Sequence, residues 1–101
     1  MTHLRIWKFR PPEDRAHEFA IAYGADGVWA ALFGKAQGYL GTTLYRPGEP
    51  GGWWLTVDRW SSAADFAAFG ESFDEQYRAL DRELEGVAGE EEFVGAFDDA
   101  E

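Results

Sequence analysis

The sequence contains no cysteine and no asparagine, and its only histidines are His3 and His17. The absence of cysteine excludes disulfides, thiolate metal sites and a cysteine nucleophile. The two histidines lie far apart and have no acidic residue at a metal-ligand spacing, so we expect no metal site. His17 is expected to face solvent from the first helix.

Long apolar runs are also missing. No stretch approaches the roughly 20 residues that span a bilayer, and the first residues lack the hydrophobic region of a signal peptide. We therefore expect a cytoplasmic protein that does not bind membranes.

Positive charge is scarce, with 9 Lys and Arg residues against 19 Asp and Glu residues and a net charge of -10. Because such a surface repels phosphates, no nucleic-acid partner is expected. No loop with the spacing of a calcium-binding EF-hand is present. The acidic residues gather near the end of the chain and are expected to form a solubilising surface and tail: Glu83, Glu85, Glu90, Glu91, Glu92, Asp98, Asp99 and Glu101.

Aromatic residues are plentiful, at 17% of the 101 residues, and 46% of the chain is hydrophobic. The length predicts one domain over residues 1–101. Each large apolar side chain that becomes fully buried contributes roughly 1.5–3 kcal/mol, so this composition can supply a substantial core.

Two runs rich in Thr, Val and aromatic residues, 38–46 and 53–60, predict strands, and the Pro/Gly-rich segment 47–52 predicts the turn of a hairpin. Gly41 suits a β-bulge. A first strand is predicted over 4–9 and ends at Pro11-Pro12. A last strand is predicted over 92–97.

Helices are predicted over 12–23 and 28–35, followed by a long helix of about six turns that starts at Ser61 or Ser62. Ser62 and Asp65 have the spacing of a capping box. The long helix rests on apolar residues at three- and four-residue spacing: Phe66, Phe69, Phe73, Tyr77, Leu80 and Leu84.

The resulting order, β-α(α)-β-β-α-β, predicts an α+β ferredoxin-like fold with helices on one face of an antiparallel sheet. Both faces of the hairpin carry large apolar side chains, whereas a solvated face should be polar. Tyr39 and Tyr45 are expected on one face of the first hairpin strand, and Leu40 and Leu44 on the other. A second copy of the sheet would cover the exposed face, which predicts a homodimer.

A group of aromatic side chains predicts a cavity suited to a flat apolar ligand, although each one alone is more often a core residue. Its members are Trp29, Phe33, Phe66, Phe69, Phe73 and Tyr77. His3, Tyr39 and Tyr77 are weak candidates for proton transfer to a ligand. Arg5 is a candidate for binding an anionic oxygen.

Several segments resemble the antibiotic biosynthesis monooxygenase-like family. They are Tyr23-Gly24-x-Asp26-Gly27-x-Trp29-x-x-Leu32-Phe33, Gly38 to Thr42, Leu55 to Ser61, Phe66, Phe69, and Tyr77-x-x-Leu80-Asp81. The resemblance spans roughly residues 4 to 97. It implies a dimeric α/β barrel with a ligand cavity between helices and sheet in each subunit.

The family's known activities include cofactor-independent oxygenation of aromatic polyketides, quinol oxygenation and haem degradation. The haem-degrading branch uses an Asn, a Trp and a His, whose positions fall near Arg5, Phe69 and Ala79, so none matches. The polyketide oxygenases also use an Asn, which this chain lacks.

The resemblance and the aromatic residues together favour a cofactor-independent monooxygenase of a small aromatic or apolar molecule. A non-catalytic small-molecule-binding or stress-response protein is the alternative, and an isomerase or decarboxylase is a third. An ionisable group that points into the cavity would favour an enzyme.

Overall fold

The computed structural model describes residues 1–100; Glu101, the last residue of the acidic tail, lies outside the described residues. The predicted order of strands and helices is confirmed. The elements are β1 (His3–Arg10), η1 (Glu13–Arg15), α1 (Ala16–Tyr23), α2 (Val28–Phe33), β2 (Tyr39–Tyr45), β3 (Trp54–Trp60), α3 (Ala63–Ser72), α4 (Asp74–Ala88) and β4 (Glu90–Asp98).

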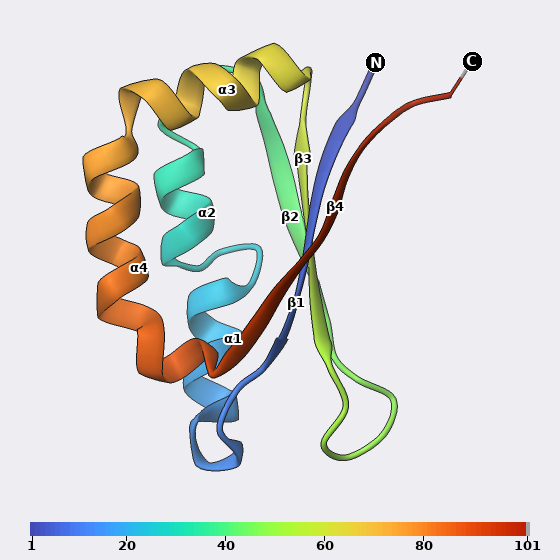
Figure 1. Ribbon diagram of the computed structural model, residues 1–101, viewed down its shortest axis with the longest axis vertical. Helices are drawn as coiled ribbons and strands as arrows, with labels where there is room; N and C mark the ends of the chain where they lie inside the picture. Colours follow the sequence, from blue (N-terminus) through green and yellow to red (C-terminus); the bar gives the residue numbers. More distant parts are fainter. Residues whose placement is uncertain (101) are drawn as a thin grey trace.

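The four strands form one antiparallel sheet in the order β2-β3-β1-β4. In residues 1–100, all the helices lie on one side of this sheet, and the other side carries no helix (Figure 1). The α+β ferredoxin-like prediction is therefore confirmed. The central strands β3 and β1 pair along their length, which places their side chains in register: Trp60 lies opposite His3, and Trp54 opposite Phe9.

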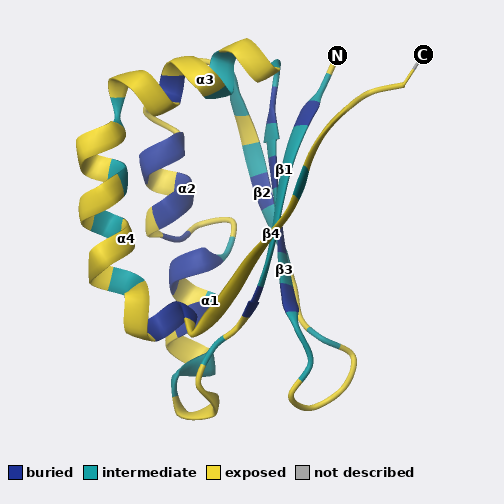
Figure 2. Ribbon diagram, viewed as in Figure 1, coloured by how far each residue is buried: buried dark blue, intermediate teal, exposed yellow. Residues whose placement is uncertain are grey.

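The burial of β3 alternates strictly along the strand (Figure 2). Trp54, Thr56, Asp58 and Trp60 are buried beneath the helices, and the residues between them are half-buried on the outer face. Successive side chains of a strand point to opposite faces, so this pattern identifies the helix-covered face.

Gly41 forms the predicted bulge, since the register of β2 against β3 shifts between Tyr39 and Gly41 and Gly41 has a φ of 135°. One inserted residue moves the following side chains to the other face. Tyr39 and Leu44 consequently share the helix-covered face, opposite Trp60 and Thr56. The expectation that Tyr39 and Tyr45 share a face was wrong for this reason.

The single long helix predicted from Ser62 was also wrong, because the chain breaks at Phe73 (φ -120°, ψ 22°) into α3 and α4. An unbroken helix over 63–88 would be about 39 Å long, more than the 37 Å longest dimension of the molecule. The break lets α3 cross one end of the sheet and α4 descend beside α2 (Figure 1). Phe73 stacks on Phe69 at the corner, 5.5 Å between ring centroids.

The start of α3 is capped as predicted. The Asp65 backbone N–H donates to Ser62 Oγ at 3.1 Å. The Asp65 carboxylate accepts from the Ser61 hydroxyl instead of the cap backbone. The cap fixes the point at which the chain leaves β3 and turns over the sheet.

The core is a continuous layer of aromatic rings between helices and sheet. Phe19 of α1 is fully buried and contacts Phe9, Tyr23 and Trp54 at centroid distances of 5.3, 4.4 and 5.4 Å. Such pairs are worth about 0.5–1.5 kcal/mol each beyond the area they bury. This layer holds the helices at a fixed height above the sheet.

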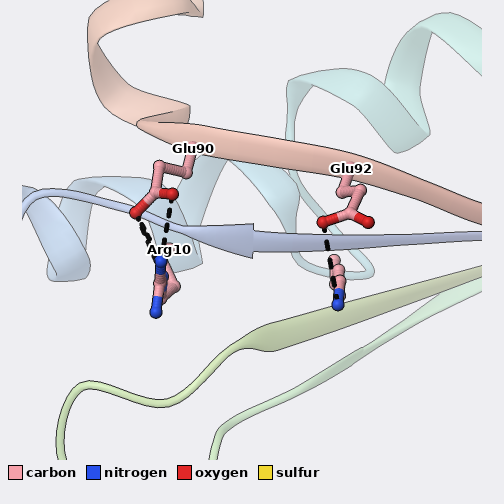
Figure 3. A network of polar contacts seen from close by, with 4 residues as sticks. Arg10, Glu90 and Glu92 are labelled. Atoms are coloured by element: carbon pink, nitrogen blue, oxygen red, sulfur yellow. Dashed lines mark hydrogen bonds and ion pairs between the residues drawn. The ribbon is translucent and has the colours of Figure 1, made fainter.

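Ion pairs connect β1 to the edge strand β4 on the outer face (Figure 3). Arg10 makes a bidentate contact to Glu90 at 2.8 and 3.0 Å, and Lys8 lies 3.7 Å from Glu92. Both glutamates and Arg10 are exposed and Lys8 is half-buried, so each pair contributes at most about 1 kcal/mol. Glu90 and Glu92 of β4 thus face solvent and also form ion pairs with β1.

Two acidic residues near the C-terminus contact the start of the chain. Asp98 belongs to β4, and its Oδ1 lies 2.8 Å from His3 Nδ1, from which it can accept a hydrogen bond. The Thr2 backbone N–H donates to Asp99 Oδ2 at 2.8 Å. The last strand therefore ends at Asp98, one residue beyond its predicted limit, and Asp99 lies just outside the sheet.

Within residues 1–100, every helix is too short or too polar to cross a membrane. The same residues contain no cluster of three or more histidine, aspartate or glutamate side chains that could hold a metal ion. His17 is exposed, as predicted.

Candidate functional site

A cavity of about 130 Å³ lies between the sheet and the helices. Strands β1, β2, β3 and β4 supply one wall, and α1, α2 and α4 supply the other. Its lining residues are Trp7, Phe9, Tyr23, Trp29, Phe33, Thr42, Thr56, Asp58, Tyr77, Asp81 and Glu91. The predicted aromatic cavity between helices and sheet is thus present.

The cavity exists because small polar residues alternate with large aromatic ones on the covered face. Thr42 pairs with Asp58 across β2 and β3, Thr56 lies two residues before Asp58 on β3, and large aromatic residues line the cavity around them. Small side chains leave unfilled space where the surrounding rings hold the layers apart. The floor of the cavity is therefore polar, and its walls are aromatic.

Asp58 is the buried acid of this floor, with 8% of its surface exposed. The Thr42 hydroxyl donates to Asp58 Oδ1 at 2.6 Å. Burial raises the pKa of Asp58 to about 6, against the lowering effect of the Thr42 hydrogen bond and of the Arg5 and Arg59 charges. A carboxyl with this pKa can both take and release a proton near neutral pH.

Arg5 lies opposite Asp58 on the paired strand, yet the two make no ion pair among the described contacts. Its guanidinium carbon lies 4.0 Å from the ring centroid of Phe66 and 4.6 Å from that of Phe93. Its Nε is buried without a hydrogen-bond partner. Arg5 therefore compensates the Asp58 charge from a distance and leaves the carboxylate available.

Tyr77 of α4 faces Asp58 from the helix side of the cavity. Burial raises the pKa of Tyr77, and the nearby Asp81 charge raises it further. The phenol stays protonated at neutral pH, so it can donate a hydrogen bond to a ligand oxygen. Trp29 is beside it, with a centroid distance of 5.0 Å.

The mouth of the cavity is acidic. Asp81 and Glu91 both line it and are exposed, so the cavity reaches solvent between α4 and β4. Burial raises the pKa of Glu91, and the neighbouring Asp81 and Glu85 charges add to this rise. Two carboxylates at the mouth repel anionic molecules.

The structure brings together only some of the residues expected at the site. Trp29, Phe33 and Tyr77 line the cavity. The other three aromatic residues lie outside its lining: Phe69 belongs to the buried core, and Phe66 and Phe73 pack against that core. Of the remaining candidates, Arg5 lies between two rings and His3 contacts Asp98. Tyr39 lies on the far side of Thr42, to which it is hydrogen-bonded at 2.5 Å.

Sequence reasoning missed Asp58, Thr42 and Thr56 as site residues. The signal was present in the alternation of β3, where Asp58 takes the same face as Trp54 and Trp60. A charged residue on a face that buries tryptophan is costly unless it is hydrogen-bonded or functional. A charged residue on the buried face of β3 therefore identifies Asp58 as a candidate site residue.

The buried acid predicts a pH-dependent change in stability. Its pKa of about 6 in the folded protein exceeds the unfolded value of about 3.9. The folded state therefore binds this proton more tightly, and the free energy of unfolding falls as pH rises between those values. We expect Asp58→Asn to raise the free energy of unfolding by about 2 kcal/mol at pH 8 and to lose this advantage near pH 4. Urea unfolding at both pH values measures the difference, and an equal change in the free energy of unfolding at both pH values would contradict the prediction.

Comparison with solved structures gives the same fold. A single-residue variant of SnoaB, a cofactor-independent oxygenase from Streptomyces nogalater, has a TM-score of 0.75 at 16% identity, covering 99% of this chain and 94% of that one. A Bordetella bronchiseptica protein described as an antibiotic biosynthesis monooxygenase has a TM-score of 0.70 at 19% identity, covering 98% and 97%. PA3566 from Pseudomonas aeruginosa has a TM-score of 0.68 at 12% identity, covering 99% and 95%.

No protein-family model matches the sequence, and comparison with curated proteins finds no relative. The structural likeness confirms, for the single chain, the ferredoxin-like fold that the resemblance to the antibiotic biosynthesis monooxygenase-like family implied. At these identities it establishes the fold and leaves the chemistry to be argued from the site.

Proposed function

We propose that this protein is a cofactor-independent monooxygenase that oxidises a single-ring quinol or phenol in the cavity, with Asp58 as the general base. The observation that carries the proposal is a buried, hydrogen-bonded carboxyl on the floor of an aromatic cavity. A merely apolar binding pocket would have no use for such a group, which costs stability when ionised. The names of the neighbouring oxygenases support the same class of reaction.

The cavity volume limits the size of the substrate. A cavity of about 150 Å³ is enough to bind one benzene molecule, and this cavity measures about 130 Å³. Because this volume is slightly below that of the benzene-binding cavity, we propose that the site takes at most one aromatic ring, between Trp29 and Asp58, and excludes a fused three-ring polyketide. Any larger substituent would extend through the mouth.

The charges limit the class of substrate as well. Asp58 on the floor and the Asp81 and Glu91 carboxylates at the mouth are all acidic. They disfavour benzoates and other anionic aromatics. A neutral hydroquinone can donate one hydroxyl to Asp58 and receive a hydrogen bond from Tyr77.

The first half of the reaction forms a carbon–oxygen bond. Asp58 takes the proton of one ring hydroxyl, and the electron pair released reaches the neighbouring ring carbon. That carbon gives electrons to dioxygen, one at a time, and bonds to it as a peroxide. The peroxide oxygen then takes a proton from solvent. The dry aromatic walls keep the quinolate poorly solvated and reactive, and the protein supplies position and proton transfer.

The second half releases water. Removal of the proton on the peroxide-bearing carbon breaks the O–O bond, and the departing hydroxide takes a proton to become water. Hydroquinone and dioxygen thus give a hydroxyquinone and one water, with one oxygen atom kept in the product. One carboxylate can serve both proton abstractions, provided that it loses the first proton in between.

The test is oxygen uptake with hydroquinone and metal- and flavin-free protein, followed by mass analysis of the product made under ¹⁸O₂. We expect one labelled oxygen in the hydroxyquinone, no uptake with anthrone because its three fused rings do not fit, and none with benzoate. Release of hydrogen peroxide with unlabelled benzoquinone would overturn monooxygenation. Tight binding of hydroquinone without uptake would favour the non-catalytic binding protein.

A homodimer is part of this proposal, since the outer face of the sheet is largely apolar and uncovered. Leu4, Ile6, Leu55 and Val57 are half-buried there, and Phe97 is 46% exposed. Charged pairs flank this patch, including Arg10 with Glu90. Two such sheets packed face to face would bury the patch and allow each chain's charges to meet the other's.

Substitution at the centre of this face tests the dimer. Ile6 pairs with Val57 on one side and Gly95 on the other, so Ile6→Glu would place a charge in the middle of the interface. We expect a dimer mass for the wild type at micromolar concentration and a folded monomer for the variant, measured by light scattering. Ile21→Glu is the matched control, because Ile21 is 64% exposed on α1. A wild-type monomer would contradict the prediction.

A further inference from the structure

A chain of hydrogen-bonded groups runs from the cavity floor to a different part of the surface. Thr42 Oγ1 donates to Asp58 Oδ1 at 2.6 Å, and Tyr39 Oη lies 2.5 Å from the same Thr42 oxygen. Because Thr42 uses its only proton on Asp58, the Tyr39 hydroxyl must be the donor to Thr42. Both bonds therefore point inward when Asp58 is ionised.

The outer end of this chain reaches a second hollow, on the edge-strand side of the sheet. Tyr39 and Thr42 both line a shallow groove between α2 and β2, together with Asp26 and Arg59. Of the three hydrogen-bonded residues, only Thr42 lines both the groove and the cavity. Asp58 and Thr42 are buried, and Tyr39 is half-buried. The three groups thus connect the two hollows through the edge of the sheet.

We propose that Tyr39, Thr42 and Asp58 form a proton relay, which carries a proton from the occupied cavity to the groove. The relay rests on the proposed function, in which Asp58 must lose the first proton before it takes the second. A ring in the cavity lies between Asp58 and the mouth, so direct release to solvent is blocked at that moment. The relay offers the remaining path.

The transfer needs no new group. Protonated Asp58 donates to Thr42 Oγ1, the Thr42 proton passes to Tyr39 Oη, and the Tyr39 proton passes to water in the groove. No bond other than O–H bonds changes, and each hydroxyl ends with one proton, its hydrogen bond reversed. The transfer therefore leaves both hydrogen bonds pointing inward, and rotation of the hydroxyls restores the outward direction that the next transfer needs.

The charged groups around the relay favour release over storage of the proton. Burial raises the pKa of Tyr39, and the positive charge of Arg59 opposes this rise. Arg5 faces Asp58 from β1, and Tyr77 faces it from α4. Arg59 and Arg5 both favour the ionised form of Asp58. The Asp26 carboxylate in the groove provides an acceptor at the outer end.

Turnover of hydroquinone by Tyr39→Phe tests the relay, because this change removes the outer hydroxyl and keeps the bond between Thr42 and Asp58. In weak buffer we expect oxygen uptake to fall at least about tenfold, and added imidazole should restore it by accepting the proton directly. Thr42→Val should lower oxygen uptake in the same way. Thr42→Ser, which keeps the hydroxyl, should restore the uptake that Thr42→Val loses. Tyr45→Phe is the matched control, since Tyr45 is 52% exposed on the same strand. If Tyr39→Phe turned over as fast as the wild type in weak buffer, or if imidazole did not restore its oxygen uptake, the relay would be overturned.

A second measurement does not depend on turnover. The cavity is filled with benzene, and the pH is then jumped from 8 to 5, which protonates Asp58. The infrared band of the protonated Asp58 carboxyl, identified by its absence in Asp58→Asn, reports the rate of protonation. We expect the band to appear at least about tenfold more slowly in Tyr39→Phe than in the wild type. Equal rates would overturn the relay even if hydroquinone is not a substrate. Full activity of Asp58→Asn would instead overturn the proposed function. The infrared rates would then still decide whether the relay exists.

Discussion

Asp58→Asn is expected to reduce oxygen uptake with hydroquinone by at least about 100-fold, since positioned general bases contribute roughly 10²–10⁴-fold to rates. The substitution keeps the size of the side chain and an oxygen that can accept from Thr42. It removes only the capacity to take a proton. The cavity should therefore bind hydroquinone as well as before, and the loss should appear in kcat with little change in KM.

The wild-type rate should also depend on pH in a way that the variant does not. Because burial raises the pKa of Asp58 to about 6, the active carboxylate increases as pH rises through that value, and the rate should rise with it. Asp81→Asn is the matched control: it makes the same chemical change in a residue that lines the same cavity at its mouth. An active Asp58→Asn with an unchanged pH profile would exclude Asp58 as the base.

Trp54→Ala is expected to lower the free energy of unfolding by about 3–5 kcal/mol, the usual cost of removing a large buried aromatic side chain. Trp54 is only 7% exposed and lies edge-on to Phe19, 5.4 Å between centroids. The cavity left behind is enclosed by α1 and the sheet, which cannot collapse into it without losing other contacts. For a domain of this size the loss is a large share of the total stability.

Trp53→Ala is the control, because the adjacent tryptophan lies on the outer face of the sheet. Its ring is covered by Lys8 and Arg10 at 4.6 and 4.4 Å, contacts worth about 0.5–1 kcal/mol each when exposed. We expect a loss of about 1–2 kcal/mol in urea unfolding of the monomeric Ile6→Glu background, which removes any effect of dimerisation. Equal losses for the two tryptophans would contradict the assignment of the two faces.

The element boundaries show how far local patterns suffice. The strands are found within about two residues of their predicted limits, because alternation and turn-forming residues act locally. The helix break at Phe73 was not predictable in this way, since Phe66, Phe69, Phe73 and Tyr77 continue one periodic stripe through it. The stripe is satisfied by two helices as well as by one, and the size of the sheet beneath decides between them.

The candidate site was likewise predictable in part. The aromatic composition and the order of the elements predicted a cavity between helices and sheet, and Trp29, Phe33 and Tyr77 were named for it. Nothing in the spacing of Thr42 and Asp58 along the chain relates them, because they are 16 residues apart. The register of β2 against β3 places them opposite each other.

The sequence by itself therefore determined the class of fold and its aromatic interior, because these follow from short-range periodicity and composition. Only the tertiary structure decided which polar groups meet within that interior, how large the cavity is, and which side of each strand is covered. These depend on strand register and on the bulge at Gly41, which are set by pairing between segments distant in the chain.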